Sequence, residues 1–250
     1  MPIARIALYA ATVTALVVSA ATAVGRMDSR WPVAVTLLAY CALIALGIFQ
    51  PSLQVFADAC TRAPRGIALV VDVSLAHMDA IDELASRCKA RGATLTLALA
   101  LGDAPQALSA ELRARIARWL TEGHRVIAKG PAGRGEALLC ALEAQEPTWT
   151  QLLGEPPSFW LASQRYSGVL GRIADAFDRT LLVPTADLRA IDQPELLATA
   201  LRKSAHEGAI VRVVPGTALA HGVSALLDAA ASLAVPVCAL ELSLSESEAL

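Results

Sequence analysis

The distribution of apolar and polar residues predicts strands that alternate with amphipathic helices. The clearest unit lies between Gly66 and Gly102, where an unbroken apolar run, Ile67 to Val71, ends at a single acid, Asp72. A helical pattern follows, and a second apolar run, Leu95 to Leu101, completes the unit. A strand, a helix and a strand within this length form a βαβ crossover. Such a crossover requires parallel strands that are buried on both faces.

The same alternation continues toward the C terminus. Helices are predicted at about 109–122, 136–145, 167–177, 192–206 and 221–233, and strands at 67–71, 95–101, 124–128, 158–162, 180–183, 210–214 and 235–240. Alternation at this spacing indicates an α/β fold, and the expected form is an irregular (β/α) barrel of roughly seven strands over residues 66–250. Acids at the carboxyl ends of such strands are well placed for chemistry, which makes Asp72 a candidate site residue.

Residues 1–50 predict a transmembrane helical hairpin. The runs Ile6 to Val24 and Trp31 to Phe49 contain no charged residue, and each is close to the roughly 20 residues that cross a bilayer as a helix. A cleaved signal peptide is the alternative for the first run, but a second apolar run follows too closely for that interpretation. Residues 51–65, which contain Pro51 and Pro64, are interpreted as a linker.

Charge gives a weak indication of orientation. Arg26 and Arg30 lie in the link between the two apolar runs and favour a cytoplasmic link. Arg5 and, more weakly, Arg62 and Arg65 oppose them. The expected arrangement is a multi-pass protein of a bacterial-type inner membrane, with its folded domain on the extracytoplasmic side.

Composition narrows the possible partners. The 250 residues carry a net charge of −2 and 4% aromatic residues, and no basic stripe is present, so nucleic acid is not an expected partner. The five cysteines form no CxxC pair and give no disulfide framework. Cys140 and Cys238 lie in apolar runs and are predicted to be small buried side chains.

Six fragments occur in the order and spacing of one known family. They are VVDVS at 70–74, KARGATLT at 89–96, RIARWLTEGHRVIA at 115–128, GEPPSFW at 154–160, GAIVRVVP at 208–215 and VPVCALEL at 235–242. Together they resemble the polysaccharide deacetylases, also called the NodB-homology domain or carbohydrate esterase family 4. The resemblance implies a metal-dependent hydrolase that removes an acetyl group from an amino sugar.

The metal-binding positions of that family are altered in this chain. The resemblance places the catalytic base at Asp72, but the metal-ligand aspartate falls at Val73. The two metal-binding histidines fall at Lys129 and near Gly133. Valine and glycine offer no side-chain lone pair, and a lysine ammonium repels a cation. No metal and no other cofactor is therefore expected.

Other functional positions of the family are altered as well. The motif arginine falls at Trp160, the late histidine at Val214 and its aspartate at Pro215. Of the family's functional residues, only the one at Asp72 is retained. Without a metal, a water molecule keeps its high pKa and the oxyanion loses its main stabiliser, so the rate would fall by orders of magnitude.

Three residues remain as site candidates. Asp72 occupies the position of a catalytic base, although capping the next turn or pairing with Lys129 is the favoured interpretation. Lys129 is a candidate substrate-binding residue that could replace the charge of the metal and hold Asp72 or an anionic ligand. A solvated loop lysine is its simpler interpretation. Trp160 is a candidate for stacking on a sugar, and His124 is expected to be structural.

These observations leave three hypotheses for function. The first is a membrane-anchored, catalytically inactive protein that serves as a binding or scaffold subunit in envelope-polysaccharide metabolism. The second is an active carbohydrate deacetylase with a rearranged site. The third is a structural subunit of a membrane complex unrelated to sugars, in contact with other membrane proteins. Because one fold supports many functions, the choice among them depends on the site.

Overall fold

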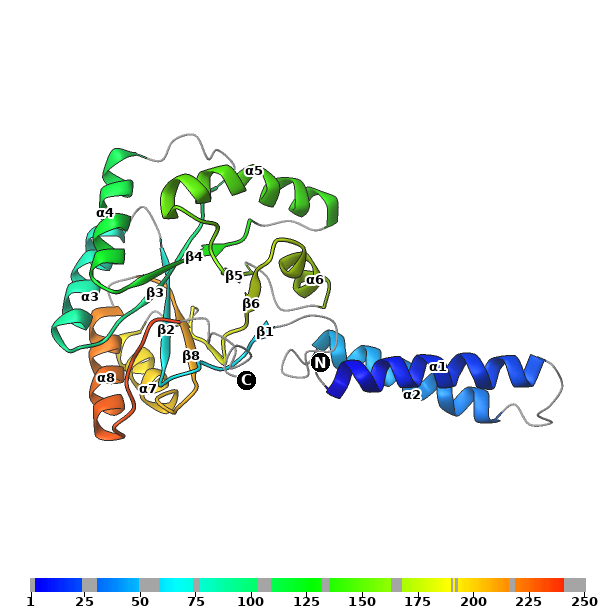
Figure 1. Cartoon of the computed structure of the whole chain (residues 1–250). Helices are drawn as coiled ribbons and strands as arrows, with labels where there is room; N and C mark the ends of the chain where they lie inside the picture. Colours follow the sequence, from blue (N-terminus) through cyan, green and yellow to red (C-terminus); the bar gives the residue numbers. More distant parts are fainter. Residues whose placement is uncertain are drawn as a thin grey trace, which may run out of the picture. The chain divides into compact units, whose positions relative to one another are not determined.

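The computed structural model describes residues 3–23, 31–49, 59–73, 77–102, 109–131, 135–162, 168–189, 191, 193–215 and 219–240 (Figure 1). The chain divides into two compact units. One contains helices α1 (Ile3–Ala23), α2 (Trp31–Phe49) and α6 (Gly168–Ala176). The other contains most of the sheet and the remaining helices.

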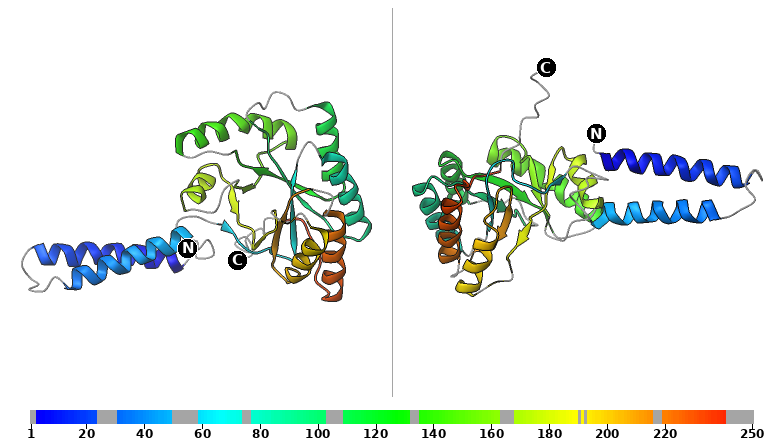
Figure 2. Two further views of the ribbon diagram at one scale, coloured as in Figure 1. Left: turned by 180° about the vertical axis from the view of Figure 1, so that it is seen from behind. Right: turned by 90° about the horizontal axis from the view of Figure 1, so that it is seen from below.

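Helices α1 and α2 lie antiparallel and pack against each other (Figures 1 and 2). Helix α1 is long and apolar enough over Ile6–Ala23 to cross a membrane, while the apolar stretch Trp31–Leu46 of α2 is shorter. Their threonine hydroxyls donate to the carbonyl four residues earlier, as in the 2.8 Å bond from Thr12 to Leu8. These bonds satisfy the hydroxyl protons within each helix.

Within the described residues, the strands form a curled, parallel sheet of eight strands, most of which lie in the second unit. Its order is β1-β6-β5-β4-β3-β2-β8-β7, and the pairings of β2 with β3 and β8, of β4 with β3 and β5, and of β7 with β8 are parallel. The strands are β1 (Ala59–Cys60), β2 (Ala68–Val73), β3 (Thr96–Leu99), β4 (Arg125–Lys129), β5 (Phe159–Leu161), β6 (Thr180–Leu182), β7 (Ala186–Asp187) and β8 (Ile210–Val213).

Helices surround these strands (Figure 1). They are α3 (Met78–Ala90), α4 (Ala110–Thr121), α5 (Gly135–Leu153), α7 (Pro194–Lys203) and α8 (Leu219–Ser232). Ser109 caps α4 by accepting a hydrogen bond from the Leu112 N–H at 3.1 Å. Gly92 ends α3 with a φ of +69°, a conformation that glycine adopts without steric cost. The α/β architecture predicted from the sequence is confirmed.

The structure adds two short strands to the predicted set, and one predicted strand is reduced to a single bridge. Strand β1 lies inside the segment 51–65 that was predicted as a linker, and β7 follows β6 after three residues. The last predicted strand, at 235–240, makes only an isolated bridge between Val237 and Ile67. Each of the two added strands has only two residues, which is too short for an apolar pattern to mark.

Helix α5 and Cys140 also differ from the prediction. The helix was expected to end at Gln145, before Pro147, but it continues to Leu153. A proline inside a helix removes one hydrogen bond, and the fully buried Trp149 anchors the roughly two additional turns. Cys140 was expected to be buried, but it lies on the exposed face of α5, and Cys238 is only partly buried.

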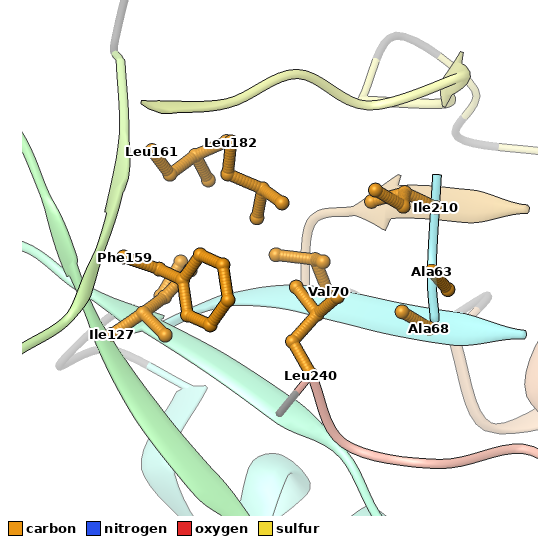
Figure 3. Close-up of a cluster of buried hydrophobic side chains, with 10 residues drawn as sticks. Ala63, Ala68, Val70, Ile127, Phe159, Leu161, Leu182, Ile210 and Leu240 are labelled. Carbon is orange, nitrogen blue, oxygen red and sulfur yellow. The ribbon is translucent and has the colours of Figure 1, made fainter. Parts of the chain in front are cut away.

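An apolar cluster fills the interior of the curled sheet (Figure 3). Its members come from six strands, from the segment between β1 and β2, and from the segment after α8: Ala63, Ala68, Val70, Ala98, Ile127, Phe159, Leu161, Leu182, Ile210 and Leu240. Side chains on a strand alternate between its two faces. The residues two positions beyond Val70, Ile127 and Ile210 therefore point into the same interior, and they are all charged.

Candidate functional site

Asp72 lies near the carboxyl end of β2 and is 4% exposed. Arg212 of β8 binds it with two parallel hydrogen bonds, Nε to Oδ1 and Nη2 to Oδ2, each 2.9 Å long. A bidentate guanidinium–carboxylate pair is among the strongest ion pairs in proteins because both partners are planar and charged. Arg212 itself is 2% exposed, so the pair is enclosed in the protein interior.

Lys129 adds a second cation to the same carboxylate. Its Nζ donates to Oδ2 of Asp72 at 2.7 Å from the end of β4, two strands away. The residue between them is Ala98 of β3, which pairs in register with Asp72. Because alanine is small, the lysine side chain can reach across β3. The interpretation that Asp72 pairs with Lys129 is confirmed.

The three side chains differ in exposure. Those of Asp72 and Arg212 are 6% and 3% exposed, while that of Lys129 is 24% exposed. Solvent therefore reaches the cluster through Lys129. We refer to Asp72, Lys129 and Arg212 as the charged cluster.

A second ion pair lies beside the charged cluster. Asp187 of β7 pairs in register with Arg212 and binds the guanidinium of Arg189 at 2.7–2.9 Å. Burial raises the pKa of Asp187, but hydrogen bonds and charge from Arg189, with the charge of Arg212, outweigh burial and hold it below its usual value. The pKa of Arg189 is raised, chiefly by its hydrogen bonds to Asp187 and in part by the charge of Asp72.

This geometry leaves Asp72 poorly suited to act as a base. Its two oxygens already accept three charge-assisted hydrogen bonds. A general base needs an oxygen within reach of the proton that it removes. A proton taken up by Asp72 would neutralise the counterion of the buried Arg212, and a buried cation without a counterion is costly.

The residues present do not suit a catalytic metal. Val73 is an apolar side chain, and Lys129 places an ammonium where the resemblance expects a histidine. Gly133 lies outside the described residues. Within the described ranges there is no group of three or more His, Cys, Asp or Glu side chains that could hold a metal ion. A catalytic zinc ion needs about three such protein ligands.

Trp160 is not part of the charged cluster. It alternates along β5 with Phe159 and Leu161, which belong to the interior apolar cluster, so its ring lies on the other face of the sheet. The ring is 1% exposed and packs on Gly130, where a Cβ atom would lie 1.9 Å from Nε1. Packing is its observed role, and sugar stacking stays an untested prediction.

Arg212 was not recognised from the sequence. It is the only charged residue in GAIVRVVP, and an isolated charge within a fully buried strand requires a buried partner. This requirement is the feature of the sequence that could have identified Arg212 as a site residue. The resemblance instead places the family's late histidine at Val214, and Val214 is 38% exposed.

A cavity of about 300 Å³ lies away from the charged cluster. Its lining includes Gly123, His124, Arg125, Ser158 and Leu240. Arg125 begins β4 and Lys129 ends it, so the cavity and the charged cluster are at opposite ends of the sheet.

Comparisons with known proteins identify the fold. The sequence matches no family model and no curated protein. Among solved structures, a pseudoenzyme of the CE4 family from Bacillus anthracis is similar with a TM-score of 0.60 and 16% identity, covering 75% of this chain and 69% of that chain. A mutant CE4 pseudoenzyme with restored enzymatic activity matches with the same TM-score, 0.60.

Deacetylases are similar as well. The chitin deacetylase from the fungal pathogen Colletotrichum lindemuthianum matches with a TM-score of 0.58 and 15% identity, over 71% of this chain and 88% of that chain. A polysaccharide deacetylase from Bacillus cereus matches with a TM-score of 0.55 and 12% identity, over 72% and 94%. The chain has the fold of the CE4 polysaccharide deacetylases, in agreement with the resemblance found in the sequence.

Proposed function

We propose that this chain is a membrane-anchored, catalytically inactive relative of the CE4 deacetylases that binds or organises components of envelope-polysaccharide metabolism. The observation that carries the proposal is the pairing of Asp72 with both Arg212 and Lys129. These contacts occupy the one catalytic position that the sequence retains. The similar structures include both deacetylases and a pseudoenzyme, so the site residues, rather than the fold, support inactivity.

The membrane part of the proposal rests on the helical unit. Helix α1 is apolar over 18 residues, and α2 packs against it as a second apolar helix. We propose that both cross the membrane and that the folded domain lies on the extracytoplasmic side. An anchored binding domain there would hold its ligand or partner close to the membrane surface, where envelope polymers are assembled.

The proposal is tested by measuring acetate release from N-acetylated chitin oligomers by the full chain in detergent. The assay is run without added metal and with zinc or cobalt, beside an active CE4 chitin deacetylase as the positive control. We expect no release above the uncatalysed background and no metal retained after dialysis. Metal-dependent release above this background would show an active enzyme with a rearranged site.

A further inference from the structure

We propose that the charged cluster is an anion-binding site, and that Lys129 contacts a carboxylate or phosphate group carried on a glycan. This inference rests on the proposed function, because it assigns a ligand class to the site that has lost its metal chemistry. It follows from the balance of charge, the division of hydrogen bonds and the exposure of the three side chains.

The balance of charge is positive. The charged cluster and the pair beside it contain the carboxylates of Asp72 and Asp187 and the cations Lys129, Arg212 and Arg189. Two negative charges therefore face three positive charges. Positive charge in a partly buried site attracts anions and repels cations more strongly than it would in bulk water, because the local dielectric is lower.

The hydrogen bonds divide unequally between the two cations at Asp72. Arg212 makes both bonds of the bidentate pair and is buried, so it neutralises the carboxylate on its own. Lys129 contributes one bond, and its ammonium carries three N–H donors. Asp72 is the single partner of Nζ within the described part of the chain, which leaves two donors for a ligand.

Exposure selects Lys129 as the contact. Its side chain is 24% exposed, against 3% for that of Arg212. A ligand oxygen that approached from solvent would therefore meet the ammonium first. An ammonium recognises a carboxylate or a phosphate as a point charge. Arg212 and Asp72 would hold the lysine in place rather than touch the ligand.

The experiment measures binding of three glycan probes to the full chain in detergent by titration calorimetry. The probes are an oligogalacturonate with carboxylates, a phosphate-bearing glycan oligomer, and a neutral N-acetylglucosamine oligomer of similar length. We expect one or both anionic probes to bind, with the affinity falling as salt is added. Binding of one anionic probe and not the other identifies the group that is recognised.

Variants locate the binding. Lys129→Met should raise the Kd for the anionic probe about tenfold, which is the scale of one charged hydrogen bond. Lys129→Arg should retain most of the affinity. Lys203→Met is the matched control, because Lys203 is an exposed lysine at the end of α7, outside the charged cluster, and this change should leave the Kd unaltered.

Three results would overturn the inference. They are no binding of either anionic probe, equal binding by Lys129→Met and the unaltered chain, or equal binding of the neutral probe. Circular dichroism shows whether Lys129→Met is folded, and Lys129→Arg with the salt series provides the test if it is not. Acetate release by the chain would refute the proposed function alone, while loss of anion binding without acetate release would refute this inference alone.

Discussion

At the scale of single residues, Asp72 is better explained as a structural partner than as a base. Changing Asp72 to Asn should lower the free energy of unfolding by about 3–5 kcal/mol, because the buried Arg212 loses its counterion. A catalytic base that is not needed for folding gives the opposite expectation, since removing it often leaves stability unchanged or higher. Urea unfolding of the full chain in detergent distinguishes the two outcomes.

A double variant provides the control for that measurement. Replacing both Asp72 and Arg212 with leucine removes the carboxylate and the buried cation together, while Lys129 can turn toward solvent. Apolar replacement of a whole buried ion pair is often neutral or stabilising. The double variant should therefore be more stable than Asp72→Asn. If it were less stable, the ion pair would not be the reason for the loss.

His124 predicts a dependence of stability on pH. Its Nδ1 accepts the Leu95 N–H at 3.0 Å, so the ring must be neutral to keep this bond. Burial lowers its pKa from the ordinary 6.5, only partly opposed by the charge of Glu122 and the carbonyl of Ala85. The unfolded chain then binds the proton more readily, and stability falls as the pH drops below about 6.5.

The measurement compares unfolding at pH 7.5 and pH 5.5 for the unaltered chain and for His124→Gln. The contribution of one such group is at most about 1.4 kcal/mol per pH unit. The unaltered chain should lose more stability on acidification than the variant does. Equal losses in the two proteins would assign the pH dependence to other groups.

The residue scale also shows the limit of inference from sequence. Pairing of Asp72 with Lys129 could be foreseen as one possibility, because both residues lie at or near the carboxyl ends of parallel strands. Arg212 could not be placed, because it lies 140 residues from Asp72 and meets it only through the pairing of β2 with β8. Strand order decides such contacts, and local apolar patterns do not reveal it.

At the scale of elements, Asp82 links α3 to α4. Its carboxylate accepts from Trp119 Nε1 at 2.7 Å and from Arg115 at 2.6 Å, and it also pairs with Arg118. Asp82→Ala should cost about 2–3 kcal/mol, because the indole N–H of the fully buried Trp119 would lose its acceptor. Chemical unfolding measures the loss.

Glu83→Ala is the matched control for this link. Glu83 is the next residue on α3 and pairs with Arg87, and both side chains are more than half exposed. Exposed pairs of this kind contribute about 0.5 kcal/mol or less. A loss as large as that of Asp82→Ala would indicate a general effect on α3 rather than the contact with Trp119.

Elements with strong patterns were predictable, and short or interrupted ones were not. The apolar run at 67–71 marks β2, and the cap at Ser109 marks the start of α4. Strand β1 has two residues and carries no pattern, while Pro147 suggests a helix end that the packing of Trp149 overrides. Tertiary packing decides these cases, as is general for weak local preferences.

At the scale of the whole molecule, the apolar residues that hold the fold together are different from those of the charged cluster. The apolar interior of the curled sheet supplies the fold, and it needs none of the metal ligands. Val73 and Lys129, which the resemblance places at two metal-ligand positions, are therefore compatible with folding, and Asp72 has other partners in this structure. These partners are Arg212 and Lys129. On the proposed function, the fold is kept without the metal chemistry that the resemblance implies.

The orientation of the chain in the membrane can be tested through its cysteines. Cys140 lies exposed on α5, whereas Cys88 is buried and burial raises the pKa of its thiol to about 12. A variant that keeps only Cys140 should react with a membrane-impermeant maleimide in intact cells, because the proposed topology exposes the domain outside the cytoplasm. A variant that keeps only Cys88 is the matched control and should stay unlabelled until the protein is denatured.

Labelling of Cys140 only after the membrane is permeabilised would place the domain in the cytoplasm. The positive-inside argument would then be wrong. It rests on Arg26 and Arg30 in a short link, and Arg5 and, more weakly, Arg62 and Arg65 oppose it.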